Sequence, residues 1–267
     1  IKLIVSGSSS FEIKKKFKDS LVGRTIEFNI YPLSFDEFLN FKNVNINICE
    51  KITIKKTENE LKDLYLEYIL YGGYPKIVLE TNKENKEIYL QQIIDTYIRK
   101  DIRDLANIKD ILKFNKLLEI LASQSGNLLN VNELSNTSKL ARQTIDEYLF
   151  IMENTYILKP VYPYSSNLRS ELFKTPKIYF YDTGIANLLW YKHLPEKENG
   201  NIFETAIFSE LIKMDKIRKI NYWRTQDKKK IDFIIQINRS IYPIEVKLNQ
   251  AQLKLTALRY FNEKYKS

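Results

Sequence analysis

Three residues near the C-terminal end of the chain have the types and spacing of a site for a divalent cation. Asp232 lies in the apolar run IDFIIQI, and Glu245 and Lys247 lie in the next run, IYPIEVKL, after the turn residues Asn238-Arg239-Ser240. Two carboxylates are suitable ligands for a hard cation, and an ammonium group orients water or stabilises developing negative charge. The pattern therefore predicts a Mg²⁺ site with Asp232 and Glu245 as ligands and Lys247 as the catalytic cation.

The elements that must position these residues are the strands of a β-hairpin. The two apolar, β-branched runs predict the hairpin, and residues 220–224 predict an edge strand before it. Because successive side chains in a strand point to opposite faces, Glu245 and Lys247 are expected on one face of their strand, and a plausible register places Asp232 beside them. The opposite face is expected to be apolar: Ile231, Phe233, Ile235 and Ile237 on the first strand, and Ile244, Val246 and Leu248 on the second.

A helix is predicted before the hairpin, over residues 201–213, with Glu204 next to its apolar stripe. The order helix Glu, strand Asp, strand Glu-x-Lys resembles the PD-(D/E)xK nuclease fold. This resemblance implies that Glu204 is a further catalytic residue and a further metal ligand beside Asp232 and Glu245. The structural alternative is a charge network on a half-buried strand pair that satisfies itself, in a domain that binds or regulates without catalysis.

Composition favours a globular protein with an anionic partner. The chain has 267 residues, 44% of them hydrophobic, and a net charge of +9. The segment from Lys213 to Lys230 contains eight Lys or Arg residues against Asp215 and Asp227. Such a cluster suits a nucleic-acid backbone, with Lys228, Lys229 and Lys230 as candidate contacts, although a solvated lysine face is the commoner explanation.

Several classes of protein are disfavoured by the composition. One cysteine excludes an internal disulfide framework and one histidine excludes a His-rich metal site, which fits a reducing compartment. No run approaches 18 consecutive apolar residues and no signal peptide is present, so a cytoplasmic protein without a membrane partner is expected. The chain begins at Ile1 without Met, which suggests a fragment. The sequence does not predict an oligomeric state.

The N-terminal stretch carries a second resemblance. The strings GSSS, GR and PLSFDEFL follow each other within residues 7–39. Together they resemble the end of the AAA-type ATPase module in a prokaryotic family that joins this module to a nuclease-like, DUF4143-type domain. The resemblance implies nucleotide-site roles for Ser8, Ser9 and Arg24. The chain contains no G-x-x-x-x-G-K-[ST] loop, so ATP is expected in the full-length family but not in this chain, whose partner would be the missing ATPase half.

Residues 111–164 predict three helices, the middle one short, followed by a β-prone ribbon, which is the plan of a winged helix-turn-helix. Arg142, Gln143 and Thr144 would lie near the N-terminus of the recognition helix and contact nucleic acid. The same helix carries Asp146 and Glu147, which would meet phosphates poorly, so a protein-packing role stays open.

We therefore expect an α and α/β multi-domain chain. The expected parts are the C-terminal end of a P-loop ATPase module (1–45), a helical connector (46–106), a winged helix-turn-helix (107–165) and a PD-(D/E)xK nuclease-like domain (166–267). Asp182 or Thr183 is expected to cap a helix, and capping is the leading explanation for Asp182. The favoured function is a nucleic-acid-associated member of the ATPase family with a Mg²⁺-dependent nuclease site, and the rival is a non-catalytic binding or regulatory platform.

Overall fold

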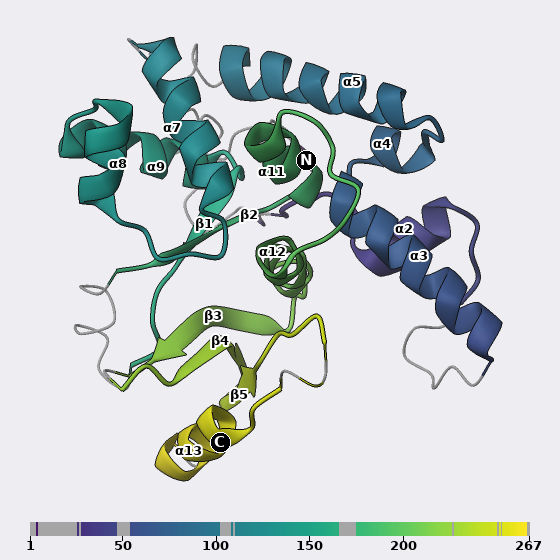
Figure 1. Cartoon of the computed structure of the whole chain (residues 1–267), viewed down its shortest axis with the longest axis vertical. Helices are drawn as coiled ribbons and strands as arrows, with labels where there is room; N and C mark the ends of the chain where they lie inside the picture. The colour runs from purple at the N-terminus through teal and green to yellow at the C-terminus, as the bar shows by residue number, and fades with distance from the viewer. Residues whose placement is uncertain are drawn as a thin grey trace.

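The structure, a computed structural model, describes residues 4, 26, 28–46, 54–101, 108, 110–165, 175–225, 227–249, 251 and 253–265. Helices and two small antiparallel sheets make up a mixed α/β fold (Figure 1). Ser8, Ser9 and Arg24, the expected nucleotide-site residues, lie outside the described part of the chain.

The first described helices form an arm on one side of the molecule (Figure 1). Helix α2 (Phe35–Phe41) begins with a capping box, in which Ser34 and Glu37 each accept the other's backbone N–H. Helix α3 (Lys55–Tyr71) packs against it through Tyr68. Helix α4 (Pro75–Leu79) follows after a short turn and has Pro at its first position, where the missing N–H costs nothing.

The largest core lies among the helices that follow. Helix α5 (Lys83–Ile93) continues into a π-helical segment, η1 (Ile94–Asp101), and then come α7 (Ile111–Ser123), α8 (Val131–Ser138) and α9 (Arg142–Asn154). The order of long, short and long helices over α7 to α9 agrees with the prediction from the sequence. Their apolar faces bury one continuous cluster that also includes residues of the next strands and helix.

Strand β1 (Leu158–Val161) pairs antiparallel with β2 (Lys177–Phe180). The β-ribbon expected after the third helix therefore consists of β1 and β2. Because β2 lies after residue 166, this pairing runs across the position where we expected a domain boundary. Helix α11 (Thr183–Tyr191) follows β2, and Asp182 accepts the N–H of Ile185 at its start, which confirms the predicted cap.

Helix α12 (Gly200–Leu211) lies between the two sheets (Figure 1). The second sheet has the order β3 (Ile217–Arg224), β4 (Lys230–Ile237) and β5 (Ser240–Ile244), all antiparallel. Phe208 of α12 packs on one face of this sheet, and Phe261 of α13 (Thr256–Tyr265) packs on the other.

One face assignment from the sequence is wrong. Phe233, Ile235 and Ile237 do share the α12 face, but Ile231 packs with Trp223 and Phe261 on the α13 side. The β3–β4 pairing shifts register between Asn221 and Trp223, next to the pair that Trp223 forms with Ile231. A register shift breaks the strict alternation on which the prediction depended.

A buried polar network joins the arm to helices α11 and α12. Asp182 also accepts the backbone N–H of Gly73 at 2.8 Å. Gly72 has φ +81°, and a Cβ there would lie 2.4 Å from Asp182 Oδ1, so this close approach requires glycine. Burial raises the pKa of Asp182, while these N–H donors and Lys213 favour its charged form.

The second half of this network lies on α12 and the residues after it. Lys213 Nζ donates to Leu33 O at 2.9 Å, to Tyr68 Oη at 2.8 Å and to Glu210 Oε1 at 3.2 Å. Tyr68 in turn donates to Glu210. The Lys213 side chain is only 8% exposed, which a lysine tolerates because all its donors are satisfied.

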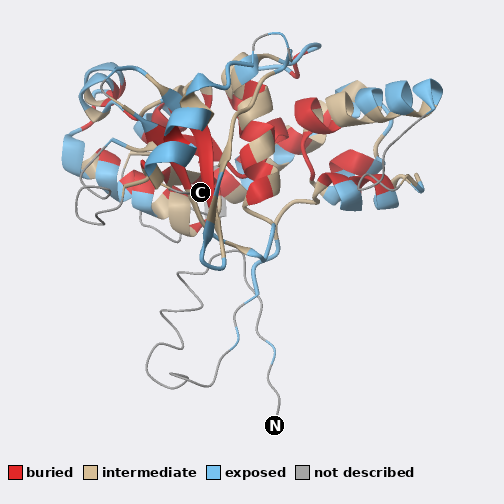
Figure 2. Cartoon of the chain, turned by 90° about the horizontal axis from the view of Figure 1, so that it is seen from below, coloured by how far each residue is buried: buried red, intermediate tan, exposed pale blue. Residues whose placement is uncertain are grey.

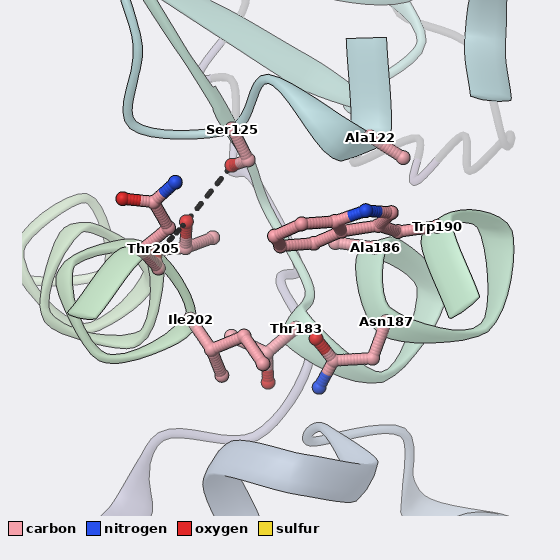
Figure 3. Close-up of a pocket in the computed structure, with 9 residues that line it drawn as sticks. Ala122, Ser125, Thr183, Ala186, Asn187, Trp190, Ile202 and Thr205 are labelled. Carbon is pink, nitrogen blue, oxygen red and sulfur yellow. Dashed lines mark hydrogen bonds between the residues drawn. The ribbon is translucent and has the colours of Figure 1, made fainter. Parts of the chain in front are cut away.

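Buried segments gather in the interior, and the outer faces of the helices are exposed (Figure 2). A small cavity of about 10 Å³ remains where α7, α11 and α12 meet, with the Ser125 and Thr205 hydroxyls hydrogen-bonded at 2.8 Å on one side and Trp190 on the other (Figure 3). This is the space that about one water needs. No helix in the described part of the chain is long and apolar enough to cross a membrane.

Candidate active site

Asp232, Glu245 and Lys247 come together beside the second sheet, as predicted from the sequence. Asp232 is central in β4 and accepts the backbone N–H of Val246 at 3.0 Å. Lys247 Nζ lies 2.5 Å from Glu245 Oε1 and 3.4 Å from Asp232 Oδ2, so one ammonium bridges both carboxylates. The hydrogen-bonded part of β5 ends at Ile244, earlier than expected, and Glu245 to Lys247 continue alongside β4.

Each of the two carboxylates keeps one buried oxygen without a partner. Asp232 Oδ1 and Glu245 Oε2 accept no hydrogen bond from any described residue. The Asp232 side chain is 1% exposed and that of Glu245 is 9% exposed. Buried polar atoms are almost always satisfied, so two unsatisfied oxygens on neighbouring carboxylates indicate a place for a further ligand.

The pKa values of Glu245 and Lys247 are both raised. This favours the neutral form of Glu245 and the charged form of Lys247. Burial raises the pKa of Glu245, and the neighbouring Asp232 carboxylate raises it further, against the opposing effect of Lys247. The pKa of Lys247 is raised because hydrogen bonds and charge from Glu245 and Asp232 outweigh its own desolvation. Lys247 is therefore an ammonium at neutral pH.

Glu204, the expected fourth member, is engaged elsewhere. Its Oε1 lies 2.7 Å from Lys177 Nζ and accepts a hydrogen bond from Tyr179. Burial and Glu204 raise the pKa of Tyr179 well above its usual value, so this phenol stays protonated and donates. Among the described residues no group of three or more His, Cys, Asp and Glu side chains could hold a metal ion. The structure thus does not bring Glu204 into one ligand set with Asp232 and Glu245.

The remaining pair still fits Mg²⁺. This ion keeps several of its waters and is commonly held by one or two carboxylates together with oxygens of a phosphate. Asp232 and Glu245 offer two carboxylates and two free oxygens, which is the protein's share of such a site. Asp232 and Glu245 would hold the ion, and such a site would not need Glu204 as a third ligand.

The candidate nucleic-acid contacts in the β3–β4 turn are only partly free. Lys228 and Lys230 are exposed, whereas Lys229 Nζ lies 4.8 Å from the centre of the Tyr260 ring. Lys213 is the first residue of the predicted basic cluster. The prediction that it is a surface charge is wrong, because its side chain is buried in the polar network with Glu210.

The other candidate contacts lie at the start of α9. Arg142 and Gln143 are exposed and Thr144 is half-buried. Arg142 donates to Asn132 at 3.2 Å, and Gln143 donates to Glu147 at 3.4 Å. The exposed face of α9 therefore mixes a cation with acidic side chains. Nucleic-acid contact and protein packing both remain open as roles for this helix.

The pKa of Glu245 leads to a stability prediction. Because the folded pKa is raised, the folded state holds this proton more tightly than the unfolded state, so the free energy of unfolding falls as pH rises from the unfolded pKa through the folded pKa. Glu245→Gln removes this term. The melting temperature of Glu245→Gln minus that of wild type should thus increase from pH 4 to pH 7, measured by scanning calorimetry. Glu60→Gln, on an exposed position of α3, is the matched control, and an equal rise there would contradict the assignment.

Three family models match the chain in succession. The first residues, 1–39, match an AAA domain. Residues 62–196 match the domain of unknown function DUF8612, and residues 199–267 match the domain of unknown function DUF4143. The middle match includes the boundaries that we expected at 106 and 165, and the expected division into four parts stays a prediction.

Relatives with similar sequences occur in bacteria and archaea. An uncharacterized protein of Haemophilus influenzae is 29% identical over 91% of this chain and 58% of its own length, and an uncharacterized protein of Methanocaldococcus jannaschii is 27% identical over 93% and 56%. An uncharacterized protein of Mycobacterium tuberculosis is 24% identical over 67% and 42%. The chain thus spans about half the length of the curated relatives it matches. No solved structure gives a significant match.

Proposed function

Since the chain belongs to the family of the domain of unknown function DUF8612, here within an AAA-type ATPase-like family with a DUF4143 domain, we propose that it carries a divalent-metal phosphodiesterase site acting on nucleic acid. The observation that carries the proposal is the pair of unpartnered buried oxygens, Asp232 Oδ1 and Glu245 Oε2, beside the ammonium of Lys247. We further propose that residues 107–165 form a winged helix-turn-helix and that residues 166–267 form a PD-(D/E)xK nuclease-like domain.

The roles follow from the chemistry of each group. Asp232 and Glu245 would hold Mg²⁺, which when bound polarises phosphoryl oxygens as a Lewis acid. Asp232 is fixed by the N–H of Val246, so one of its oxygens is oriented before any ligand arrives. Lys247 contacts both carboxylates and, as a cation, stabilises negative charge that develops on a phosphate placed next to them.

The direct test is cleavage of nucleic acid by the purified chain. Supercoiled DNA and single-stranded RNA are incubated with Mg²⁺, with Mn²⁺ or with EDTA. Nicking that requires the metal is expected with at least one of these substrates. A chain that cleaves none of them with either metal, while circular dichroism shows it folded, does not have this function.

Binding of the backbone is expected to depend on the lysines of the β3–β4 turn. The logarithm of the association constant for DNA falls by about 0.9 per phosphate contact for each decade of salt. Replacing Lys228, Lys229 and Lys230 together with Ala should flatten that slope by up to about three units, measured by fluorescence anisotropy. A larger effect of Arg142→Ala would place the contact on α9 instead.

One observation favours a second candidate, a non-catalytic binding or regulatory platform. Glu204, whose counterpart completes the site in the nuclease-like resemblance, forms its own ion pair with Lys177 and a hydrogen bond with Tyr179. A platform would bind partners through the same surfaces without metal-dependent cleavage, and the cleavage test above separates the two.

A further inference from the structure

A second cavity lies next to the candidate active site. Its volume is about 240 Å³, and it is lined by the loop after α7, the start of β2, the first turns of α12 and the β3–β4 ends. Ligand pockets usually measure about 300–1,000 Å³, so this one suits a small group rather than a large cofactor. Lys230 and Ile231 contribute to its wall, and the next residue of β4 is Asp232.

The charge of the cavity is positive and only partly compensated. Lys177 is paired with Glu204, and both side chains are nearly buried, at 13% and 14% exposed. Arg224 and Lys230 lie opposite each other as Cα partners in β3 and β4. Both residues are exposed, and neither has an ion-pair or hydrogen-bond partner among the described residues, so about two positive charges at the pocket are available to a ligand.

Neutral donors complete the lining. Asn127 and Asn201 are among the lining residues, and no hydrogen bond of their side-chain amides occurs within the described part of the chain. Gly126, which also lines the cavity, has φ +85°, a backbone conformation that favours glycine. The lining thus combines one ion pair, two exposed cations and two asparagines.

We propose that this cavity binds a phosphate monoester. Such a group carries about −1.5 to −2 charges at neutral pH, which matches the uncompensated charge of Arg224 and Lys230. The planar guanidinium of Arg224 donates two parallel hydrogen bonds to phosphate oxygens, and lysine supplies a point charge. A phosphodiester carries only one charge, so a site with about two uncompensated positive charges matches a terminal phosphate or a free mononucleotide better.

This inference goes beyond the proposed function, because binding in the cavity requires neither the metal nor cleavage. Lys230 links the two sites electrostatically, since its charge is among the causes that lower the pKa of Glu245 against burial. A terminal phosphate held here would lie beside the Asp232 site and select the end of a strand.

The test is calorimetric titration of the whole chain in EDTA with 5′-AMP and 3′-AMP, with adenosine as the uncharged comparison. Saturable binding of at least one monophosphate is expected, about tenfold or more tighter than adenosine. Arg224→Ala should weaken that binding by about tenfold or more, and Lys230→Ala should do the same. Arg239→Ala, an exposed arginine at the other end of β4, is the matched control and should change it less than twofold.

A second pair of probes identifies the source of the phosphate. If the ligand is the end of a strand, a 5′- or 3′-phosphorylated oligonucleotide binds more tightly than its hydroxyl-ended counterpart; if it is a free nucleotide, only AMP shows the difference. Absence of saturable binding for all phosphorylated probes overturns the proposal, and so does an equal loss in Arg224→Ala and Arg239→Ala. Because EDTA excludes metal-dependent cleavage, failure here is distinguishable from failure of the phosphodiesterase.

Discussion

Lys247→Met lowers the rate of Mg²⁺-dependent nicking by about 10²–10³-fold, the usual cost of removing one group that stabilises charge in the transition state. The ammonium is the only described side-chain cation within 3.4 Å of both carboxylates. Methionine keeps the length and much of the packing of the side chain. Asp232→Asn is expected to lose at least as much, because the amide keeps the shape but removes the charge that holds the metal. The rate constant of plasmid nicking at saturating Mg²⁺ measures both.

The control for this experiment is a lysine with a similar ion pair far from the site. Lys62→Met, whose Nζ pairs with Glu58 on the surface of α3, should leave the nicking rate unchanged. A loss in Lys247→Met of less than about threefold, with the fold intact by circular dichroism, would remove Lys247 from the chemistry. Equal losses in both variants would mean that the effect is not local to the site.

Asp182→Ala is expected to lower the free energy of unfolding by about 2–6 kcal/mol. The carboxylate accepts the buried N–H of Gly73 and the N–H of Ile185, so alanine leaves two buried donors without partners. Each unsatisfied buried donor costs about 1–3 kcal/mol, and the lost helix cap is included in that sum. Chemical denaturation with urea, followed by tryptophan fluorescence, measures the change.

Asp215→Ala is the matched control, because Asp215 is exposed in the turn after α12. Its free energy of unfolding should stay within about 0.5 kcal/mol of wild type. Asp182→Asn should fall between the two, since the amide oxygen still accepts one hydrogen bond. A loss in Asp182→Ala no larger than in Asp215→Ala would show that the junction of the arm with α11 does not depend on this carboxylate.

Features that depend on neighbouring residues were predictable from the sequence. The cap at Asp182 follows from one Asp placed before a helical pattern, and its bond to Ile185 is confirmed. The meeting of Asp232 with Glu245 and Lys247 follows from two strands and a short turn, in which Asn238 adopts the left-handed conformation that Asn tolerates. In each case the contact spans at most 15 residues, so local rules fix it.

Features that depend on distant segments were not predictable. Glu204 has the helical position that the resemblance requires, but its partners Lys177 and Tyr179 belong to β2, whose place beside α12 the sequence does not state. Lys213 looks like a surface charge because its partners Leu33 and Tyr68 are 180 and 145 residues away. From the sequence alone, charged residues are assigned to the surface because they are rarely buried without a partner. Only the three-dimensional structure shows which of them have a buried partner.

Helix α12 carries two glutamates that contact different parts of the chain. Glu204 contacts Lys177 at the phosphate-sized cavity, and Glu210, six residues later, contacts Tyr68 and the backbone N–H of Phe35 at the start of α2. Six residues span about 9 Å of a helix that does not stretch. The segment around Phe35 belongs to the part that matches an AAA domain. A displacement of α2 that keeps the Glu210 contacts would therefore also move Glu204, because both glutamates belong to one helix.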